Sequence, residues 1–281
     1  MARAPALSLR AQVASQAEFI VNNLRQTSYE YLEQIDVDRG IYDCDCSSFA
    51  GFVLARAAPG HYAMIPQKEP GQPRPRAFEY YEFFSSLTPE SAGGWRRIDL
   101  LRDARRGDVI AWRFPRILKN HDTGHVLFVA RNPEVNSAGI FFVRVYDSAS
   151  KPHFRDTRGE AKEQSENGVG SGTIKFRVDN SGRPVTFQFG PADQFESLPI
   201  AIGRIEPLPA APQSRGQALA LARLGTVRWS AGRCQLQVAE AGVVGEFERV
   251  EQLVTFDQPV QDALPQVEEP GGAGVAEQSQ V

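Results

Sequence analysis

The chain has 281 residues, and 42% of them are hydrophobic, so it can bury the core of one large domain with or without a small appendage. Its formal net charge of −3 and its lack of a basic stripe with interleaved aromatic residues argue against nucleic acid as a partner. Three cysteines do not make a disulfide framework, which favours a reducing compartment or an exported protein that needs no disulfides.

Residues 1–20 contain no signal-peptide core, because arginines and polar residues interrupt the apolar ones. No segment approaches the roughly 18 consecutive apolar residues that a membrane-spanning helix requires. We therefore expect a cytoplasmic protein with no integral membrane association. Non-classical export to the cell envelope remains open.

Three segments of the first third have helical patterns. Apolar residues three and four positions apart predict an amphipathic helix over residues 9–25 and a second helix over residues 47–57. Residues 61–76 are rich in proline and predict an irregular surface excursion. An aromatic segment, residues 77–87, predicts a short helix directly after it.

Short apolar segments rich in β-branched and aromatic residues then predict strands. Three of these segments, separated by turns, predict an antiparallel meander: residues 109–112, 124–131 and 140–147. A hairpin and a further strand are predicted at residues 173–178, 184–189 and 198–205. The polar residues 148–172 predict a loop, and Gly168–Gly172 within it predicts a turn, since it lacks the full spacing of a phosphate-binding loop.

These segments divide the chain into three parts. Residues 1–207 are expected to form the main domain, with residues 61–95 as an insertion. After a proline-rich linker, residues 208–256 alternate as short strands and predict a small β-rich extension. Residues 257–281 carry acidic but no basic residues, together with Pro and Gly, and predict a disordered acidic tail.

Cys46 lies at the predicted start of the second helix, where free N–H groups and the helix dipole favour an acidic, nucleophilic thiol. A buried structural thiol is the alternative interpretation. His125 begins one apolar strand and Asp147 ends the next, so a hairpin would bring them together. Cysteine catalysis needs a nucleophile, a base and a group that orients the base. Cys46, His125 and Asp147 are the candidates, with His153 as the rival third member.

The chain also resembles the NlpC/P60 cysteine peptidases in three short motifs, which occur in that family's order. Residues 45–49 (DCSSF) resemble its D-C-S-G-hydrophobic nucleophile motif. Residues 106–112 (RGDVIAW) resemble its G-D-hydrophobic strand, and residues 124–126 (GHV) resemble its histidine strand. A polar residue on the following strand completes that family's triad, and Asp147 occupies the matching place here.

The resemblance implies an α+β fold, with a papain-like NlpC/P60 core in which N-terminal helices pack on an antiparallel β-sheet. It implies a thiol protease or amidase that needs no metal or other cofactor. The implied substrate is a peptide of bacterial cell-wall peptidoglycan, cleaved at an amide bond. A tyrosine upstream of the cysteine lines the site in many such enzymes, which makes Tyr29 another candidate beside the expected substrate contacts. Those contacts are Tyr31, Tyr42, Ser47, Trp112 and His153.

Two alternatives to a cell-wall hydrolase remain. One is a catalytically silent binding module of the same shape, in which the thiol is incidental. The other is an amidase that acts on substrates outside the cell wall. A metal site at Cys44 and Cys46 is disfavoured, because structural zinc sites use cysteine pairs with wider spacing and four good ligands. Cys44 is expected to be a packed thiol.

Overall fold

The computed structural model describes residues 7–90, 93–115, 122–159, 166–208, 226–230 and 233–237. The helices in these ranges are α1 (Leu9–Asn23), α2 (Cys46–Ala57), α3 (Pro59–Tyr62) and α4 (Ala77–Ser86). Three short strands precede or lie between them: β1 (Gln26–Ser28), β2 (Gln34–Asp36) and β3 (Ile41–Asp43). The strands of the larger sheet are β4 (Trp95–Arg97), β5 (Val109–Arg113), β6 (Gly124–Val129), β7 (Glu134–Val135), β8 (Phe141–Ala149), β9 (Gly168–Val178), β10 (Pro184–Gln188) and β11 (Ile200–Ile205).

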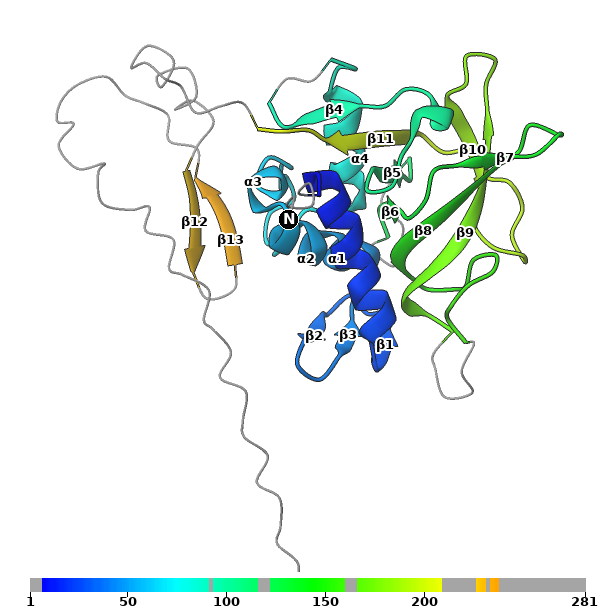
Figure 1. The fold of residues 1–281 in the computed structure, drawn as a ribbon. Helices are drawn as coiled ribbons and strands as arrows, with labels where there is room; N and C mark the ends of the chain where they lie inside the picture. Colours follow the sequence, from blue (N-terminus) through cyan, green and yellow to red (C-terminus); the bar gives the residue numbers. More distant parts are fainter. Residues whose placement is uncertain are drawn as a thin grey trace, which may run out of the picture. The chain divides into compact units, whose positions relative to one another are not determined.

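The larger sheet has the strand order β10-β9-β8-β6-β5-β11-β4, with β7 paired to the outer end of β8. All of these pairings are antiparallel. Neighbours β5, β6 and β8 form the meander that the sequence predicts. Figure 1 shows a curled sheet with α1 and α2 against one side. The predicted α+β class is therefore confirmed.

Two hydrophobic clusters cover the two faces of this sheet. On the helix side, Phe49 of α2 meets Phe128 of β6 edge to face, with ring centroids 6.1 Å apart. On the other side, Trp112 of β5 stacks on Phe187 of β10 at 4.1 Å. Side chains alternate along a strand, so Leu127 lies on the face opposite to that of Phe128. This alternation assigns each polar residue of β6 and β8 to one face.

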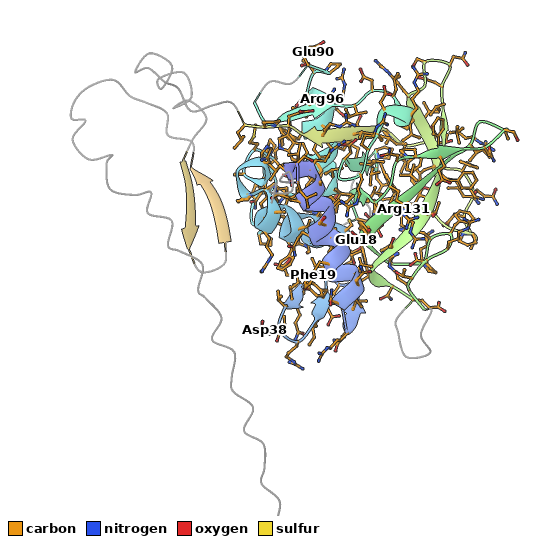
Figure 2. All side chains as sticks on the ribbon, in the orientation of Figure 1. Glu18, Phe19, Asp38, Glu90, Arg96 and Arg131 are labelled. Carbon is orange, nitrogen blue, oxygen red and sulfur yellow. The ribbon has the colours of Figure 1, made fainter. Side chains whose placement is uncertain are left out.

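Helix α1 is bound to the sheet by polar contacts as well as by its apolar face. Glu18 accepts hydrogen bonds from the Tyr146 hydroxyl (3.0 Å) and from the Arg106 guanidinium (2.7 Å). The adjacent Phe19 lies on the outer side of the helix and is 58% exposed (Figure 2). The predicted helices over residues 9–25, 47–57 and 77–87 are confirmed as α1, α2 and α4, within two residues at each end.

The predicted insertion contributes to the core. Residues 61–95 include α4, and the buried side chains of Tyr80, Phe84 and Trp95 belong to the cluster on the helix side of the sheet. Trp95 also begins β4, which pairs with the end of β11. This segment therefore adds the edge strand β4 to the larger sheet and packs α4 against the helix side of that sheet.

One sequence prediction is wrong. Gly168–Gly172 does not form a turn but begins β9, which runs antiparallel to the end of β8. Gly172 pairs with Val145, and Gly170 pairs with Asp147. The predicted loop over residues 148–172 is therefore shorter, because β8 continues to Ala149 and β9 starts at Gly168. At Gly170 and Gly172, side chains from the intervening loop occupy the space where a Cβ would lie.

Within the predicted β-rich extension, β12 (Thr226–Ser230) and β13 (Arg233–Gln237) pair as an antiparallel hairpin. The rest of residues 209–256 and the predicted acidic tail, residues 257–281, lie outside the described residues. Among the described helices, each is too short or too polar to cross a bilayer.

Candidate functional site

Helix α2 begins at Cys46 because Asp45 caps it. One carboxylate oxygen of Asp45 accepts a hydrogen bond from the Ser48 amide at 2.7 Å and another from the Ser47 hydroxyl at 2.9 Å. Aspartate is among the preferred N-cap residues, since its oxygen satisfies an amide that has no partner within the helix. The cap fixes the first turn of α2 and therefore the position of the Cys46 thiol.

The Cys46 thiol, at the start of α2, is buried beside Tyr29 and β6. Its side chain is almost fully covered, with the residue only 4% exposed. The Val126 amide of β6 donates a hydrogen bond to the sulfur, and the Tyr29 hydroxyl lies 4.0 Å from it. Burial and then the Asp45 carboxylate raise the pKa of Cys46 well above its ordinary value, and these two hydrogen bonds only partly oppose the shift. The thiol is therefore neutral at rest, whereas the helix position alone predicts an acidic one.

Arg74, from the proline-rich segment before α4, offsets the charge of Asp45. Its guanidinium lies 2.9 Å from the second carboxylate oxygen of Asp45 and 4.0 Å from a carboxylate oxygen of Glu33. Its side chain is only 12% exposed, so this ion pair is largely shielded from water. One end of the Asp45 carboxylate thus holds the helix and the other holds Arg74.

His125 and Asp147 meet as the sequence predicts. The Nε2 atom of His125 lies 2.6 Å from Oδ2 of Asp147, and both side chains are buried. The imidazole packs against Trp112, with ring centroids 5.1 Å apart, and against Phe189 at 5.2 Å. His125 therefore lies on the sheet face opposite to α2, and Cys46 reaches β6 at the backbone of Val126, the next residue.

Two further side chains, those of His153 and Arg158, also bind Asp147. Its Oδ2 lies 2.8 Å from Nε2 of His153, and its Oδ1 accepts a hydrogen bond from the Arg158 guanidinium at 2.5 Å. Burial alone would raise the pKa of Asp147, but the charges of His153 and Arg158 and the hydrogen bonds from His125 and His153 hold it well below its ordinary value. Asp147 is therefore an anion at neutral pH, and it contacts both histidines. His153 lies behind Asp147 rather than in its place.

The glycines of β9 make room for this cluster. A Cβ on Gly172 would lie 2.5 Å from Cβ of His153, and a Cβ on Gly170 would lie 2.7 Å from Cγ of Arg158. Neither distance is compatible with a side chain at the glycine. Arg158 is 6% exposed, and it further donates to the carbonyls of Gly168 (2.7 Å) and Asp147 (2.8 Å). Gly170 and Gly172 therefore occur where the buried His153 and Arg158 side chains leave no room for a Cβ.

Four of the expected substrate contacts, Ser47, Trp112, Tyr31 and Tyr42, lie in three different surroundings. Ser47 is buried and hydrogen-bonds Asp45, and Trp112 packs on His125, so both adjoin the candidate triad. Tyr31 is 46% exposed and packs edge to face on Tyr29, with ring centroids 5.9 Å apart. Tyr42, by contrast, is buried in the core against Phe52 at 5.9 Å. The structure therefore gives Tyr42 a packing role.

Two residues of this site, Arg74 and Arg158, are not among the candidates from the sequence. Tyr29 is a candidate there beside other upstream tyrosines; its burial raises its pKa, so its hydroxyl stays protonated and able to donate toward Cys46. Arg74 and Arg158 lie in segments that read as polar and irregular, where buried and exposed arginines have the same pattern. The glycine spacing of β9 was the available signal for a buried partner such as Arg158.

The cluster of His125, Asp147 and His153 also has the residue types of a metal site. Among the described residues, His125, Asp147 and His153 place ligand atoms within 4.8 Å of one another. Ligands about 2.0–2.1 Å from a tetrahedral zinc ion lie about 3.3 Å apart. Both histidine Nε2 atoms instead lie 2.6–2.8 Å from the same oxygen, which is hydrogen-bond spacing. This geometry suits protons between the three groups better than a metal ion.

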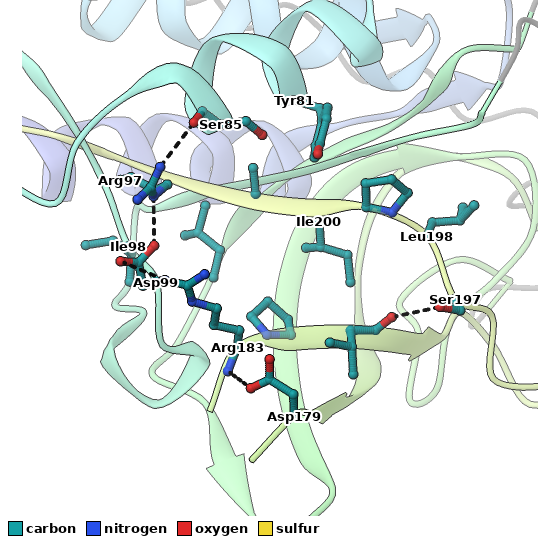
Figure 3. A pocket seen from close by; sticks show the side chains of 15 residues that line it. Tyr81, Ser85, Arg97, Ile98, Asp99, Asp179, Arg183, Ser197, Leu198 and Ile200 are labelled. Carbon is teal, nitrogen blue, oxygen red and sulfur yellow. Dashed lines mark hydrogen bonds and ion pairs between the residues drawn. The ribbon is translucent and has the colours of Figure 1, made fainter. Parts of the chain in front are cut away.

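A separate cavity of about 550 Å³ lies between β10, β11 and the segment after β4 (Figure 3). Its lining includes none of the candidate triad. Its charged groups satisfy one another, since Asp99 lies 2.7 Å from the Arg97 guanidinium and 3.7 Å from that of Arg183. This cavity therefore shows no unpaired charge that would select a ligand.

Comparison with known proteins supplies no functional assignment. No family profile and no solved structure matches the chain. It is similar to uncharacterized protein R653 of Acanthamoeba polyphaga mimivirus, with 26% identity over 185 residues, which are 58% of this chain and 77% of the viral protein. The function must therefore be argued from the site itself.

Proposed function

We propose that the chain is a cysteine hydrolase that cleaves an amide bond with Cys46 as nucleophile, His125 as base and Asp147 as the residue that orients the base. The observation that carries the proposal is the 2.6 Å hydrogen bond between His125 and Asp147 at the start of β6, directly beside the amide that binds the Cys46 sulfur. We further propose a papain-like core of the NlpC/P60 type, and peptides of bacterial cell-wall peptidoglycan as substrates, on the motif resemblance.

The orientation of the imidazole supports this assignment of roles. Asp147 is acceptor-only when ionised, so Nε2 of His125 must carry the proton of their hydrogen bond. A neutral His125 then has its lone pair on Nδ1, and we propose that this atom takes the thiol proton. Asp147 thereby fixes the tautomer of the base, as the third member of a triad does.

The reaction then follows from the groups present. His125 takes the proton of Cys46 while the sulfur attacks the amide carbonyl carbon, and amides of the first turn of α2 stabilise the oxyanion. His125 next protonates the leaving amine, and a thioester to Cys46 remains. His125 then takes a proton from water, whose oxygen attacks the thioester carbon. The C–S bond breaks, the acid is released, and His125 returns the proton to the Cys46 sulfur.

The neutral state of the thiol favours one route of activation. Burial and Asp45 raise the pKa of Cys46, so its resting form is the thiol rather than the thiolate. Proton transfer to His125 therefore accompanies the attack on the substrate. Arg74 and Tyr29 assist this transfer. The positive charge of Arg74 offsets the negative charge of the Asp45 carboxylate, and the Tyr29 hydroxyl can donate to the sulfur, so both favour the developing thiolate.

The same burial favours a second candidate function. A module that binds a ligand without chemistry tolerates a covered thiol, and Cys46 is only 4% exposed. In that case Cys46 would pack as a small hydrophobe, and His125 and Asp147 would stabilise the end of the sheet.

Mass spectrometry of purified peptidoglycan fragments incubated with the protein distinguishes the hydrolase from the binding module. We expect cleavage products from the wild-type protein and none from Cys46→Ala. Cys44→Ala is the matched control, because Cys44 is also buried, lies two residues away and hydrogen-bonds a backbone carbonyl. Equal cleavage by wild type and Cys46→Ala would refute the nucleophile. Cleavage of another amide but not of these fragments would refute only the substrate class.

A further inference from the structure

The ring of His153 lies between two hydrogen-bond acceptors. Its Nε2 atom is 2.8 Å from Oδ2 of Asp147, and its Nδ1 atom is 3.1 Å from the backbone carbonyl oxygen of Phe189. A neutral imidazole carries a proton on one nitrogen and a lone pair on the other. A neutral ring would therefore set a lone pair against an oxygen at one of these contacts. Only the imidazolium form donates to both.

The charges around His153 require the same state. Two buried carboxylates face it: Asp147, and Asp156, which accepts from the His153 amide at 2.6 Å. Arg158 binds both of them, at 2.5 Å and 2.7 Å, and supplies one positive charge. Lys151, in the same loop, is half exposed and is paired with Asp193. A second buried positive charge is needed for balance, because an unpaired buried charge is costly.

His125 is the other group able to supply that charge, but its contacts differ. In the described part of the chain, its ring makes a hydrogen bond through Nε2 to Asp147 and otherwise meets the aromatic rings of Trp112 and Phe189. A single N–H satisfies that contact, so a neutral His125 loses nothing. His153 is therefore the histidine that the geometry protonates.

We propose that His153 is held as an imidazolium and acts as a positioning residue, which with Arg158 neutralises the Asp147–Asp156 pair and keeps His125 neutral. The assignment of charge to His153 stands on its two acceptors and the surrounding charges, and it does not depend on the proposed function. The consequence for His125 rests on the proposed function, because a neutral imidazole matters there as the acceptor of the Cys46 proton. Without the His153 charge, the excess negative charge would favour a proton on His125.

Nitrogen NMR of the imidazole rings tests the charge on His153 without any substrate. We expect one ring with protons on both nitrogens between about pH 6 and pH 9, where an unperturbed histidine loses its proton. That signal should be absent from His153→Gln and present in His61→Gln. His61 is the matched control, because it is also buried and its ring bonds the Glu206 carbonyl, outside this cluster. A His153 ring with one proton at pH 7 would overturn the proposal, and stoichiometric zinc binding by that neutral ring would make the cluster a metal site instead.

The pH dependence of kcat/KM tests the positioning role. His153→Gln removes the charge but keeps a donor, so we expect the acid limb of the profile to move to higher pH by about one unit. A purely structural role would lower the rate at every pH and leave the limb in place, which would overturn the positioning role. If no amide substrate is cleaved by the wild-type protein, the proposed function fails while the NMR result still decides the charge on His153.

Discussion

At the scale of single residues, burial and the neighbouring Asp45 carboxylate keep the Cys46 thiol protonated at neutral pH. The start of α2 at Cys46 and the hydrogen bond between His125 and Asp147 agree with the predictions. The helix position favours an acidic thiol, yet the pKa of Cys46 is raised. Burial decides this difference, and it depends in part on β6, about 80 residues later in the sequence, whose Val126 amide contacts the sulfur.

This difference yields a prediction for thiol reactivity. Near pH 7, we expect iodoacetamide to alkylate Cys46 more slowly than a small free thiol, because the neutral form is a poor nucleophile. Asp45→Asn should accelerate alkylation, since it removes the second cause of the raised pKa and keeps a good N-cap.

Asp43→Asn is the matched control for that experiment, because Asp43 is also buried but acts on the pKa of Cys44. Peptide mapping of the labelled protein measures each cysteine separately. Alkylation of wild-type Cys46 faster than the free thiol would contradict the raised pKa and restore the acidic thiol that the helix position predicts.

At the scale of secondary-structure elements, periodicity predicted the helices and most strands, because each buries one face against the sheet. Periodicity predicted residues 173–178 of β9 as a strand but missed the start of β9. Its Gly168–Gly172 segment has no apolar alternation to read, since the groups that fill its face come from His153 and Arg158 in the preceding loop. A strand segment that packs against loop side chains through its glycines shows no alternation of apolar and polar residues.

A substitution in β9 tests this packing. Gly172→Ala should destabilise the protein by about 1–3 kcal/mol, because the new Cβ would lie 2.5 Å from Cβ of His153. It should also lower activity, since His153 contacts Asp147. Gly139→Ala is the control: its φ of +74° costs about 1 kcal/mol, but its Cβ meets no atom within 4 Å. Urea unfolding of the three proteins measures the effect, and equal losses for both variants would count against the packing argument.

At the scale of the whole molecule, the buried charge cluster links stability to pH. The pKa of Asp147 is lower in the folded protein than in the unfolded chain, so the unfolded chain takes up the proton first as the pH falls. The stabilisation by Asp147 is complete above about pH 4 and is lost as the pH falls through the folded value.

Asp147→Asn should therefore be less stable than wild type at neutral pH, with a difference that narrows as the pH falls below about 4. Thermal unfolding between pH 3 and pH 7 measures this, with the exposed Asp38 as the control in Asp38→Asn (Figure 2). A difference between wild type and Asp147→Asn that stays constant over this range would show that Asp147 titrates as it does in the unfolded chain.

One further hydrogen bond, outside the candidate triad and the buried charge cluster, links the helix layer to the sheet. The Ser148 hydroxyl, next to Asp147 on β8, donates a 2.5 Å hydrogen bond to the backbone carbonyl of Cys44, two residues before Cys46. The strand that carries the orienting carboxylate is thereby tied to the segment that leads into the nucleophile helix. Any breathing motion that uncovers the thiol by lifting the start of α2 must break this bond. Exposure of Cys46 by such a motion therefore also costs the contact between β8 and the segment before α2.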